Sequence, residues 1–182
     1  MTRLILLDRD GVINLESPDY IKDVDEWVPI PGSIDAIAKL KRAGYHVAVC
    51  TNQSGVGRGI VTPAALDRIH ARLHALLAEG GVALDGLSYC PHHPDANCDC
   101  RKPRPGMLCR TMQALGITGA ETVFVGDAIR DVEAALAAGC HPVLVRTGGG
   151  ARVERQARAL GVEQVADDLA AYARTLLESA SC

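Results

Sequence analysis

The chain has 182 residues, a formal net charge of −3 and 48% hydrophobic residues, which suits one globular domain with a sizeable core. This charge excludes a polybasic surface for nucleic acid or membranes, and 3% aromatic residues leave little for stacking on single-stranded nucleic acid. No stretch approaches the roughly 20 apolar residues of a membrane span, and the N-terminus lacks the layout of a signal peptide. We therefore expect a cytoplasmic protein whose seven cysteines are thiols or metal ligands rather than disulfides.

Strand-like and helix-like segments alternate along the chain. Apolar runs and helical periodicity predict strands at 3–7, 46–50, 87–90, 122–125 and 142–145, and helices at 32–42, 63–79, 105–115 and 131–138. The remainder is expected to be mostly helical, with Gly148–Gly150 as a loop rather than a phosphate cradle. Such alternation predicts an α/β protein with a three-layer, Rossmann-like parallel sheet. We expect a single domain over 1–182, with no insertion large enough for a cap domain.

Two carboxylates follow the first predicted strand directly. Residues two apart on extended backbone face the same side, so Asp8 and Asp10 point to one site while Arg9 points away. Two carboxylates held together repel each other unless a cation or a proton lies between them. With Gly11 allowing the chain to turn, the run is either a surface pair or a site for Mg²⁺ and a nucleophile.

Further polar residues follow the second and fourth predicted strands. Thr51 offers a hydroxyl group, and the loop after it can present backbone amides to an anion, although Thr-Asn is also common in turns. Asp127 adds a third carboxylate after the fourth strand. In parallel sheets ligands bind beyond the carboxyl ends of the strands, so these groups are expected to meet. Because Mg²⁺ usually takes one or two carboxylates and several waters, Asp8, Asp127 and the Asp10 backbone carbonyl would suffice as its ligands.

Basic residues and a fourth carboxylate complete this set. Lys102 can supply a point charge for a phosphoryl oxygen, with Arg101 contacting another part of the substrate; the alternative is a solvated basic loop. Asp131 either orients Lys102 or a metal-bound water, or it is a helix N-terminal residue favoured by the helix dipole.

A second cluster of residues lies at about 90–100. Cys90, His92, Cys98 and Cys100 form a C-x-H-x₅-C-x-C pattern. Four such ligands fit a tetrahedral, structural Zn²⁺ with no open position for catalysis. His93 competes with His92 as a ligand, and the spacing favours His92. The site would fix the loop that carries Arg101 and Lys102. The other cysteines, Cys50, Cys109, Cys140 and Cys182, are expected to be small buried or terminal residues without a role.

The order Asp-x-Asp-Gly, Thr-Asn, Lys and Gly-Asp-x-x-x-Asp resembles the haloacid dehalogenase superfamily of phosphotransferases over roughly residues 1–146. The resemblance implies that Asp8 is the nucleophile forming an aspartyl-phosphate and that Asp10 is the general acid, then the general base. Thr51 and Lys102 would hold phosphoryl oxygens, and Asp127 would complete the Mg²⁺ site. An Asp at position 10 is the feature expected of a phosphatase in this superfamily.

Two branches of the superfamily share such a zinc loop. The runs at 8–14, 51–55, 58–59 and 101–107 resemble the heptose 1,7-bisphosphate 7-phosphatases, whereas the five residues between His92 and Cys98 resemble the histidinol-phosphate phosphatases. The heptose branch implies release of the C7 phosphate, a heptose 1-phosphate product and a place in ADP-heptose and lipopolysaccharide core synthesis. It also implies substrate contacts from ten residues: Arg9, Glu16, Ser17, Pro18, Asp19, Tyr20, Asn52, Gln53, Ser54 and Arg101.

Some expectations remain open at this point. Some heptose enzymes carry Lys where this chain has Ala128, so the anomer preferred at C1 is undecided; Arg130 is a candidate for the same phosphate. A remote alternative is a zinc-stabilised binding module without catalysis, which would lack part of the catalytic set. We expect a small phosphorylated sugar as the substrate, no nucleic acid or membrane partner, and a monomer.

Overall fold

The structure, a computed structural model, describes residues 1–180 and contains one six-stranded parallel sheet in the order β3-β2-β1-β4-β5-β6. The strands are β1 (Leu4–Leu7), β2 (His46–Asn52), β3 (Gly86–Cys90), β4 (Thr122–Gly126), β5 (His141–Val145) and β6 (Gln164–Ala166). All four residues of β1 are fully buried, as expected for a strand covered on both faces. The predicted α/β fold class is therefore confirmed.

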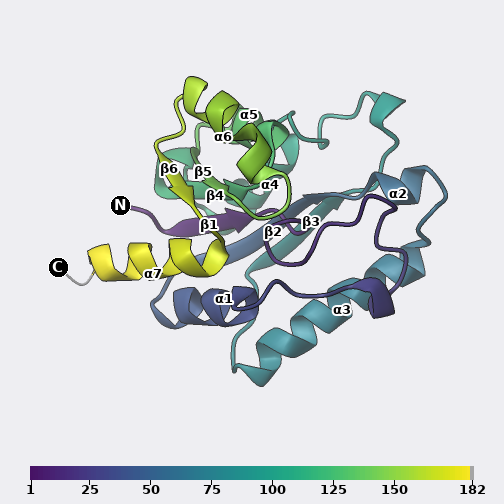
Figure 1. Cartoon of the computed structure of the whole chain (residues 1–182), viewed down its shortest axis with the longest axis horizontal. Helices are drawn as coiled ribbons and strands as arrows, with labels where there is room; N and C mark the ends of the chain where they lie inside the picture. Colours follow the sequence, from purple (N-terminus) through teal and green to yellow (C-terminus); the bar gives the residue numbers. More distant parts are fainter. Residues whose placement is uncertain (181–182) are drawn as a thin grey trace.

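Helices cover both faces of this sheet (Figure 1). One face carries α1 (Ser33–Arg42), α3 (Pro63–Glu79) and α7 (Leu169–Ala180); the other carries α4 (Gly106–Leu115), α5 (Ile129–Ala137) and α6 (Gly150–Ala159). The larger core packs Ile37, Ile69 and Leu169 of the first three helices against β1, β2, β4 and β5. A second core lies under α4 and α5, where Met107 and Ala134 pack with Phe124.

Several helix ends follow local sequence rules. The side chain of Thr62 accepts a hydrogen bond from the Ala65 amide (3.1 Å) and Pro63 occupies the first turn, so α3 begins where the sequence predicts. The segment between β1 and α1 is a loop whose only helical part is the turn Val24–Glu26. No helix within residues 1–180 is both long and apolar enough to cross a membrane.

The structure differs from the sequence-based elements in three places. Residues Gln164–Ala166 form strand β6, where the sequence analysis expects mostly helix; at three residues the strand is too short to give a periodic pattern. Strand β2 continues to Asn52, and Ser54–Gly57 forms the short helix α2. Gly150 is the first residue of α6 rather than part of a loop.

Candidate active site

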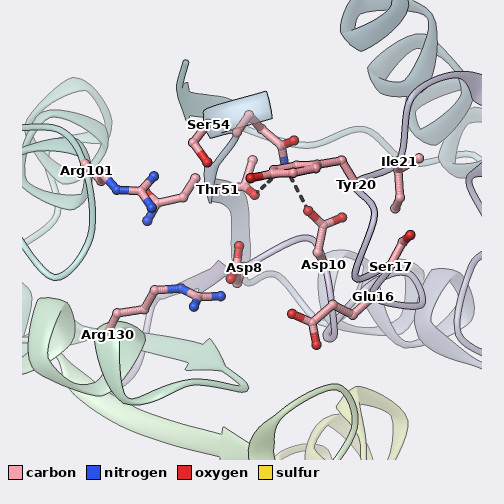
Figure 2. Close-up of a pocket in the computed structure, with 12 residues that line it drawn as sticks. Asp8, Asp10, Glu16, Ser17, Tyr20, Ile21, Thr51, Ser54, Arg101 and Arg130 are labelled. Atoms are coloured by element: carbon pink, nitrogen blue, oxygen red, sulfur yellow. Dashed lines mark hydrogen bonds between the residues drawn. The ribbon is translucent and has the colours of Figure 1, made fainter. Parts of the chain in front are cut away.

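The pocket at the carboxyl edge of the sheet is lined by Asp8, Asp10 and Thr51 of the predicted catalytic set, whereas Lys102 is buried outside its lining and contacts Asp8. β1 lies between β2 and β4, and Asp8, Thr51 and Asp127 stand at the carboxyl ends of these three neighbouring strands. In this strand order β2 and β4 lie on opposite sides of β1, so the direction of the connections reverses there, and ligands bind in the crevice at such a switch point. A pocket of about 270 Å³ opens there, with twelve lining residues (Figure 2): Asp8, Asp10, Glu16, Ser17, Tyr20, Ile21, Thr51, Asn52, Gln53, Ser54, Arg101 and Arg130.

Asp8, the predicted nucleophile, is 4% exposed at the floor of the pocket. One carboxylate oxygen accepts the Arg9 backbone amide (2.7 Å), and the other lies 2.9 Å from Nζ of Lys102. Burial raises the pKa of Asp8, and the Lys102 ammonium opposes that shift. The ammonium group of Lys102 therefore favours the ionised form of Asp8 and lowers its repulsion toward a phosphate.

Lys102 lies within a buried pair of carboxylates. Its side chain is fully buried, with Nζ 2.9 Å from Asp8 and 2.8 Å from Asp131. Burial favours the neutral amine, but the charges of Asp131 and Asp8 outweigh it and raise the pKa of Lys102. The side chain of Asn52 fixes the backbone of Lys102 from both sides, donating to its carbonyl (3.1 Å) and accepting from its amide (3.0 Å).

Asp10, the predicted general acid and base, is fixed by three side chains. Arg9 donates to its Oδ1 from Nε (3.1 Å) and Nη2 (2.9 Å), Asn14 donates to the same oxygen (2.8 Å), and Gln53 donates to Oδ2 (3.0 Å). Burial alone would raise the pKa of Asp10, but the Arg9 guanidinium and these hydrogen bonds hold it below its ordinary value. Asp10 is therefore an anion of fixed orientation before a substrate arrives.

The substrate contact predicted for Arg9 is not supported by this geometry. Its side chain is fully buried and does not line the pocket. Nη1 of Arg9 donates a hydrogen bond to Nε2 of His70 in α3 (3.2 Å). An Arg on the far side of β1 has no solvent-exposed atom for a ligand, so its contact with the site runs through Asp10. Sequence reasoning did not find His70, because a single His in an amphipathic helix carries no motif.

Asp127 and Asp131 complete the acidic group after β4. Oxygen atoms of Asp8, Asp127 and Asp131 lie within 4.8 Å of one another. Asp131 accepts hydrogen bonds from the amides of Asp127 (3.2 Å) and Ala128 (3.1 Å), so it both starts α5 and orients Lys102. The two functions that the sequence left open for Asp131 therefore coexist.

A divalent cation fits the residues at this acidic group. Burial, followed by the charges of Asp8 and Asp131, raises the pKa of Asp127 to about 7. Oδ1 of Asp127 is buried and has no hydrogen-bond partner within residues 1–180, whereas Oδ2 accepts the Gly149 amide (2.8 Å). A hard cation with oxygen ligands would satisfy Oδ1 and remove the repulsion between the carboxylates. Mg²⁺ at Asp8 and Asp127 is consistent with this donor set, and the Asp10 carbonyl stays a prediction.

The mouth of the pocket is formed by the loop after β1 and by two arginines. Glu16, Ser17 and Tyr20 line it as predicted, and Ile21 lines it in addition, whereas Pro18 and Asp19 do not. Figure 2 shows the guanidinium groups of Arg101 and Arg130 directed toward Asp8 from the side opposite this loop.

The residues after β2 divide between scaffold and pocket. Gln53 bridges Asp10 and the Thr51 hydroxyl (both 3.0 Å), and Ser54 opens the short helix α2. All four residues from Thr51 to Ser54 line the pocket as predicted. The side-chain amides of Asn52 and Gln53 are engaged within the protein, so their direct contacts with a substrate remain predictions.

The predicted zinc ligands form one cluster in the loop after β3. Cys90, His92, Cys98 and Cys100 each offer one atom within 4.8 Å of the others. Sγ of Cys90 lies 3.6 Å from Sγ of Cys98 and 3.5 Å from Nδ1 of His92. Ligands 2.0–2.3 Å from a tetrahedral zinc are separated by about 3.5–3.8 Å, so the spacing suits this metal.

His93 lies outside this cluster. Its Nδ1 accepts the Asp95 amide at 3.2 Å, so His93 starts a short turn, as the spacing argument for His92 requires. Two of the remaining cysteines, Cys50 and Cys140, are buried as expected, but Cys109 is exposed on α4. Cys182 lies outside the described residues.

Comparisons with known proteins agree with this geometry. Residues 99–172 match the HAD-hydrolase-like family. The chain is 54% identical to the D-glycero-beta-D-manno-heptose-1,7-bisphosphate 7-phosphatase of Pseudomonas aeruginosa, over 96% of this chain and 98% of that protein. The enzyme of the same name from Bordetella bronchiseptica is 44% identical over 98% of this chain and 99% of that protein.

A solved structure is similar over the whole fold. It is the D,D-heptose 1,7-bisphosphate phosphatase of B. bronchiseptica complexed with magnesium and phosphate, with a TM-score of 0.90 and 44% identity. The alignment covers 98% of this chain and 99% of that chain. The similarity thus includes both the pocket at the carboxyl edge and the loop after β3.

Proposed function

Because the chain belongs to the D-glycero-D-manno-heptose 1,7-bisphosphate 7-phosphatase family of HAD-type hydrolases, we propose that it removes the C7 phosphate of the β anomer of this sugar bisphosphate. The chain is a phosphoric monoester hydrolase. The β anomer is named in relatives that are 54% and 55% identical, which supports the assignment at C1. The observation that carries the proposal is Asp8, buried beside Lys102 and 4.8 Å or less from Asp127.

The first half of the reaction is assigned to Asp8 and Asp10. A carboxylate oxygen of Asp8 attacks phosphorus, an Asp8–phosphate bond forms, and the bond to the sugar oxygen breaks. Asp10 gives its proton to that oxygen. A phosphate dianion entering beside Asp10 favours the protonated carboxyl group, which counters the low pKa of Asp10 in the empty pocket.

The second half uses the same groups in reverse. Asp10 takes a proton from water, the water oxygen attacks phosphorus, and Asp8 leaves as a carboxylate while inorganic phosphate is released. Lys102 and the Thr51 hydroxyl hold phosphoryl oxygens. Mg²⁺, held by Asp8 and Asp127, supplies positive charge against the developing charge of the phosphoryl group.

Arg101 and Arg130 suit the second phosphate of the substrate. One guanidinium nitrogen of Arg101 is buried without a hydrogen-bond partner in the described chain. Asp131, Asp8 and Asp127 together raise the pKa of Arg130 despite its burial, so its charge is retained beside the pocket. A bisphosphate supplies a second anionic group that can pair with these guanidinium groups, whereas a monophosphate does not.

We assign Zn²⁺ to the cysteine and histidine cluster as a structural metal. Arg101 and Lys102 follow Cys100 directly, so the metal would fix the loop that carries both cations. The resemblance to heptose phosphatases supports a function of the 1-phosphate product in ADP-heptose and lipopolysaccharide core synthesis. The exposed large apolar side chains come mostly from separate elements, which supports a monomer in solution.

The test is phosphate release from both anomers of heptose 1,7-bisphosphate and from histidinol phosphate, under identical Mg²⁺ conditions. We expect kcat/KM for the β anomer to exceed that for each alternative by about tenfold or more. Asp8→Asn keeps the shape of the side chain and removes its charge, so it should abolish release. Preference for histidinol phosphate would refute the substrate assignment, and equal rates for wild type and Asp8→Asn would refute the mechanism.

A further inference from the structure

The segment between β5 and α6 contacts Gly11 and Asp127, and none of its residues has a part in the proposed reaction. We call residues Thr147–Gly149 the strap. The Thr147 hydroxyl donates a hydrogen bond to the Gly11 carbonyl (2.7 Å), and the Gly149 amide donates one to Oδ2 of Asp127 (2.8 Å). The strap thus joins the loop after β1 to the carboxylate after β4.

Close packing of backbone encloses the Asp127 carboxylate. A Cβ atom on Gly148 would lie 2.1 Å from Oδ2 of Asp127 and 2.7 Å from Cα of Gly11. A Cβ atom on Gly11 would lie 2.2 Å from the same oxygen. Both glycines have positive φ, +58° and +81°, which also favours Gly. Main chain therefore covers Oδ2 from two directions, at distances that no side chain allows.

This arrangement separates the two oxygens of Asp127. Oδ2 is satisfied by the Gly149 amide, and Oδ1 is buried with no partner in the described chain. Groups that orient a metal-binding side chain through its other atom typically change metal affinity by about 10–100-fold when they are removed. The strap occupies that position here.

We propose that the strap positions Asp127, fixing Oδ2 so that Oδ1 faces a divalent cation beside Asp8. The proposal rests on the proposed function only in that the cation is Mg²⁺; it does not depend on which phosphate ester is hydrolysed. Thr147, Gly148 and Gly149 are positioning residues, because they act through Asp127 and through the turn at Gly11.

Three variants and one matched control test this assignment. Gly148→Ala introduces the Cβ atom that would collide with Asp127. Thr147→Val removes the hydrogen bond to Gly11 at nearly constant volume, and Thr147→Ser keeps the hydroxyl group. Gly116→Ala is the control, because Gly116 has a similar φ (+65°) but nothing within 4 Å of its Cβ position.

The measurement is the Kd of Mn²⁺, followed by electron paramagnetic resonance on folded protein that is free of Mg²⁺ but retains its zinc, at fixed pH, together with displacement of Mn²⁺ by Mg²⁺. Circular dichroism and Tm establish folding for each variant. We expect Kd to rise about tenfold or more for Gly148→Ala. It should rise by a smaller factor for Thr147→Val, and remain at the wild-type value for Thr147→Ser and Gly116→Ala.

Unchanged Mn²⁺ affinity in folded Gly148→Ala and Thr147→Val would overturn the proposal, as would an equal loss in Gly116→Ala. If Gly148→Ala does not fold, Thr147→Val and its Ser counterpart decide the question. A wild type that binds Mn²⁺ and loses it in the variants, yet does not hydrolyse the heptose bisphosphate, would support the strap and refute the substrate assignment. The two failures are therefore distinguishable.

Discussion

At the scale of single residues, buried ion pairs determine the charge and the orientation of the carboxylates Asp8 and Asp10. Lys102 lies between Asp8 and Asp131, and Arg9 lies beneath Asp10. A charge removed from water is costly unless a partner and hydrogen bonds compensate it. These pairs fix the orientation of Asp8 and Asp10, and the same pairs make each partner sensitive to substitution.

Arg9→Met should destabilise the protein and slow the reaction. The substitution leaves Asp10 without its bidentate partner and His70 without its donor, so we expect a loss of about 3 kcal/mol in the free energy of unfolding. Because the general acid and base loses its orientation, kcat should fall about 10²-fold with little change in KM. Urea unfolding and steady-state kinetics measure the two effects.

The control is Arg68→Met on α3, whose ion pair with Asp23 (2.8 Å) is exposed. Such surface pairs contribute about 0–1 kcal/mol, so stability and kcat should stay near wild type. A similar loss in both variants would contradict a special function for Arg9.

His70 predicts a pH dependence of stability. Burial, followed by the charge of Arg9, lowers the pKa of His70 to about 4, against 6.5 in the unfolded chain. Between these two pH values the unfolded state binds a proton and the folded state does not, so stability is full above pH 6.5 and is lost as the pH falls toward 4. The loss is on the order of 3 kcal/mol.

His70→Gln keeps an acceptor for Arg9 but does not titrate. Urea unfolding at several pH values should therefore show a steeper loss of stability between pH 6.5 and 4 for the wild type than for His70→Gln. His74→Gln, at an exposed position of the same helix, should retain the wild-type slope. Parallel curves for wild type and His70→Gln would exclude His70 as the titrating group.

At the scale of elements, the loop after β3 carries Lys102, so the order of this loop determines the position of the Lys102 side chain. Arg104 donates to the Cys98 carbonyl (2.5 Å), and Asn52 fixes the backbone of Lys102, so the loop is anchored within the cysteine cluster and directly after it. Small metal-bound loops take their order from the metal, because they contain little apolar surface of their own.

Cys98→Ser should release zinc and lower activity together. We expect the zinc content to fall from near one ion per chain and kcat/KM to drop, because Arg101 and Lys102 lose their fixed positions. Elemental analysis and phosphate release measure both. Cys109→Ser, at an exposed cysteine on the neighbouring α4, is the matched control and should change neither. Full activity in zinc-free Cys98→Ser would show that the metal does not support the catalytic loop.

At the scale of the whole molecule, the sheet order holds repelling carboxylates together. Asp8 and Asp127 follow the neighbouring strands β1 and β4, so the fold brings them together whether or not a cation is bound. Burial is the largest cause of the raised pKa of Asp127, and the repulsion from Asp8 and Asp131 adds to it. A ligand that binds only the folded state stabilises it by mass action.

Magnesium should therefore raise Tm. At a concentration about 100 times Kd, the stabilisation is about 2.7 kcal/mol, which corresponds to roughly 5–10 °C for a chain of this length. Differential scanning calorimetry of zinc-loaded protein without and with added Mg²⁺ measures the shift. Asp127→Asn should lose most of the shift, because its amide is a weaker ligand, and without Mg²⁺ it should be at least as stable as wild type. An equal Mg²⁺ shift in both proteins would place the cation elsewhere.

The sequence by itself determined the fold class, and it predicted the proposed catalytic set and the cluster of cysteines and histidine that the structure brings together. Each is carried by local patterns: buried apolar runs, Asp pairs and Cys spacing need only a few neighbouring residues. Asp8, Thr51 and Asp127 could be assigned to one edge because parallel strands share the direction of their carboxyl ends. The short strand β6 was missed because three residues show no period.

Only the tertiary structure decided which residues support that set. Arg9 was expected to contact the substrate, but tertiary packing buries its side chain against His70, which lies 61 positions away in the sequence. Gly148 and Gly149 are loop residues, as the sequence indicates, but only the tertiary structure shows that this loop packs against Asp127. The physical reason is that the burial and the partners of a side chain depend on which distant segments the sheet brings together. No local sequence pattern indicates which segments these are.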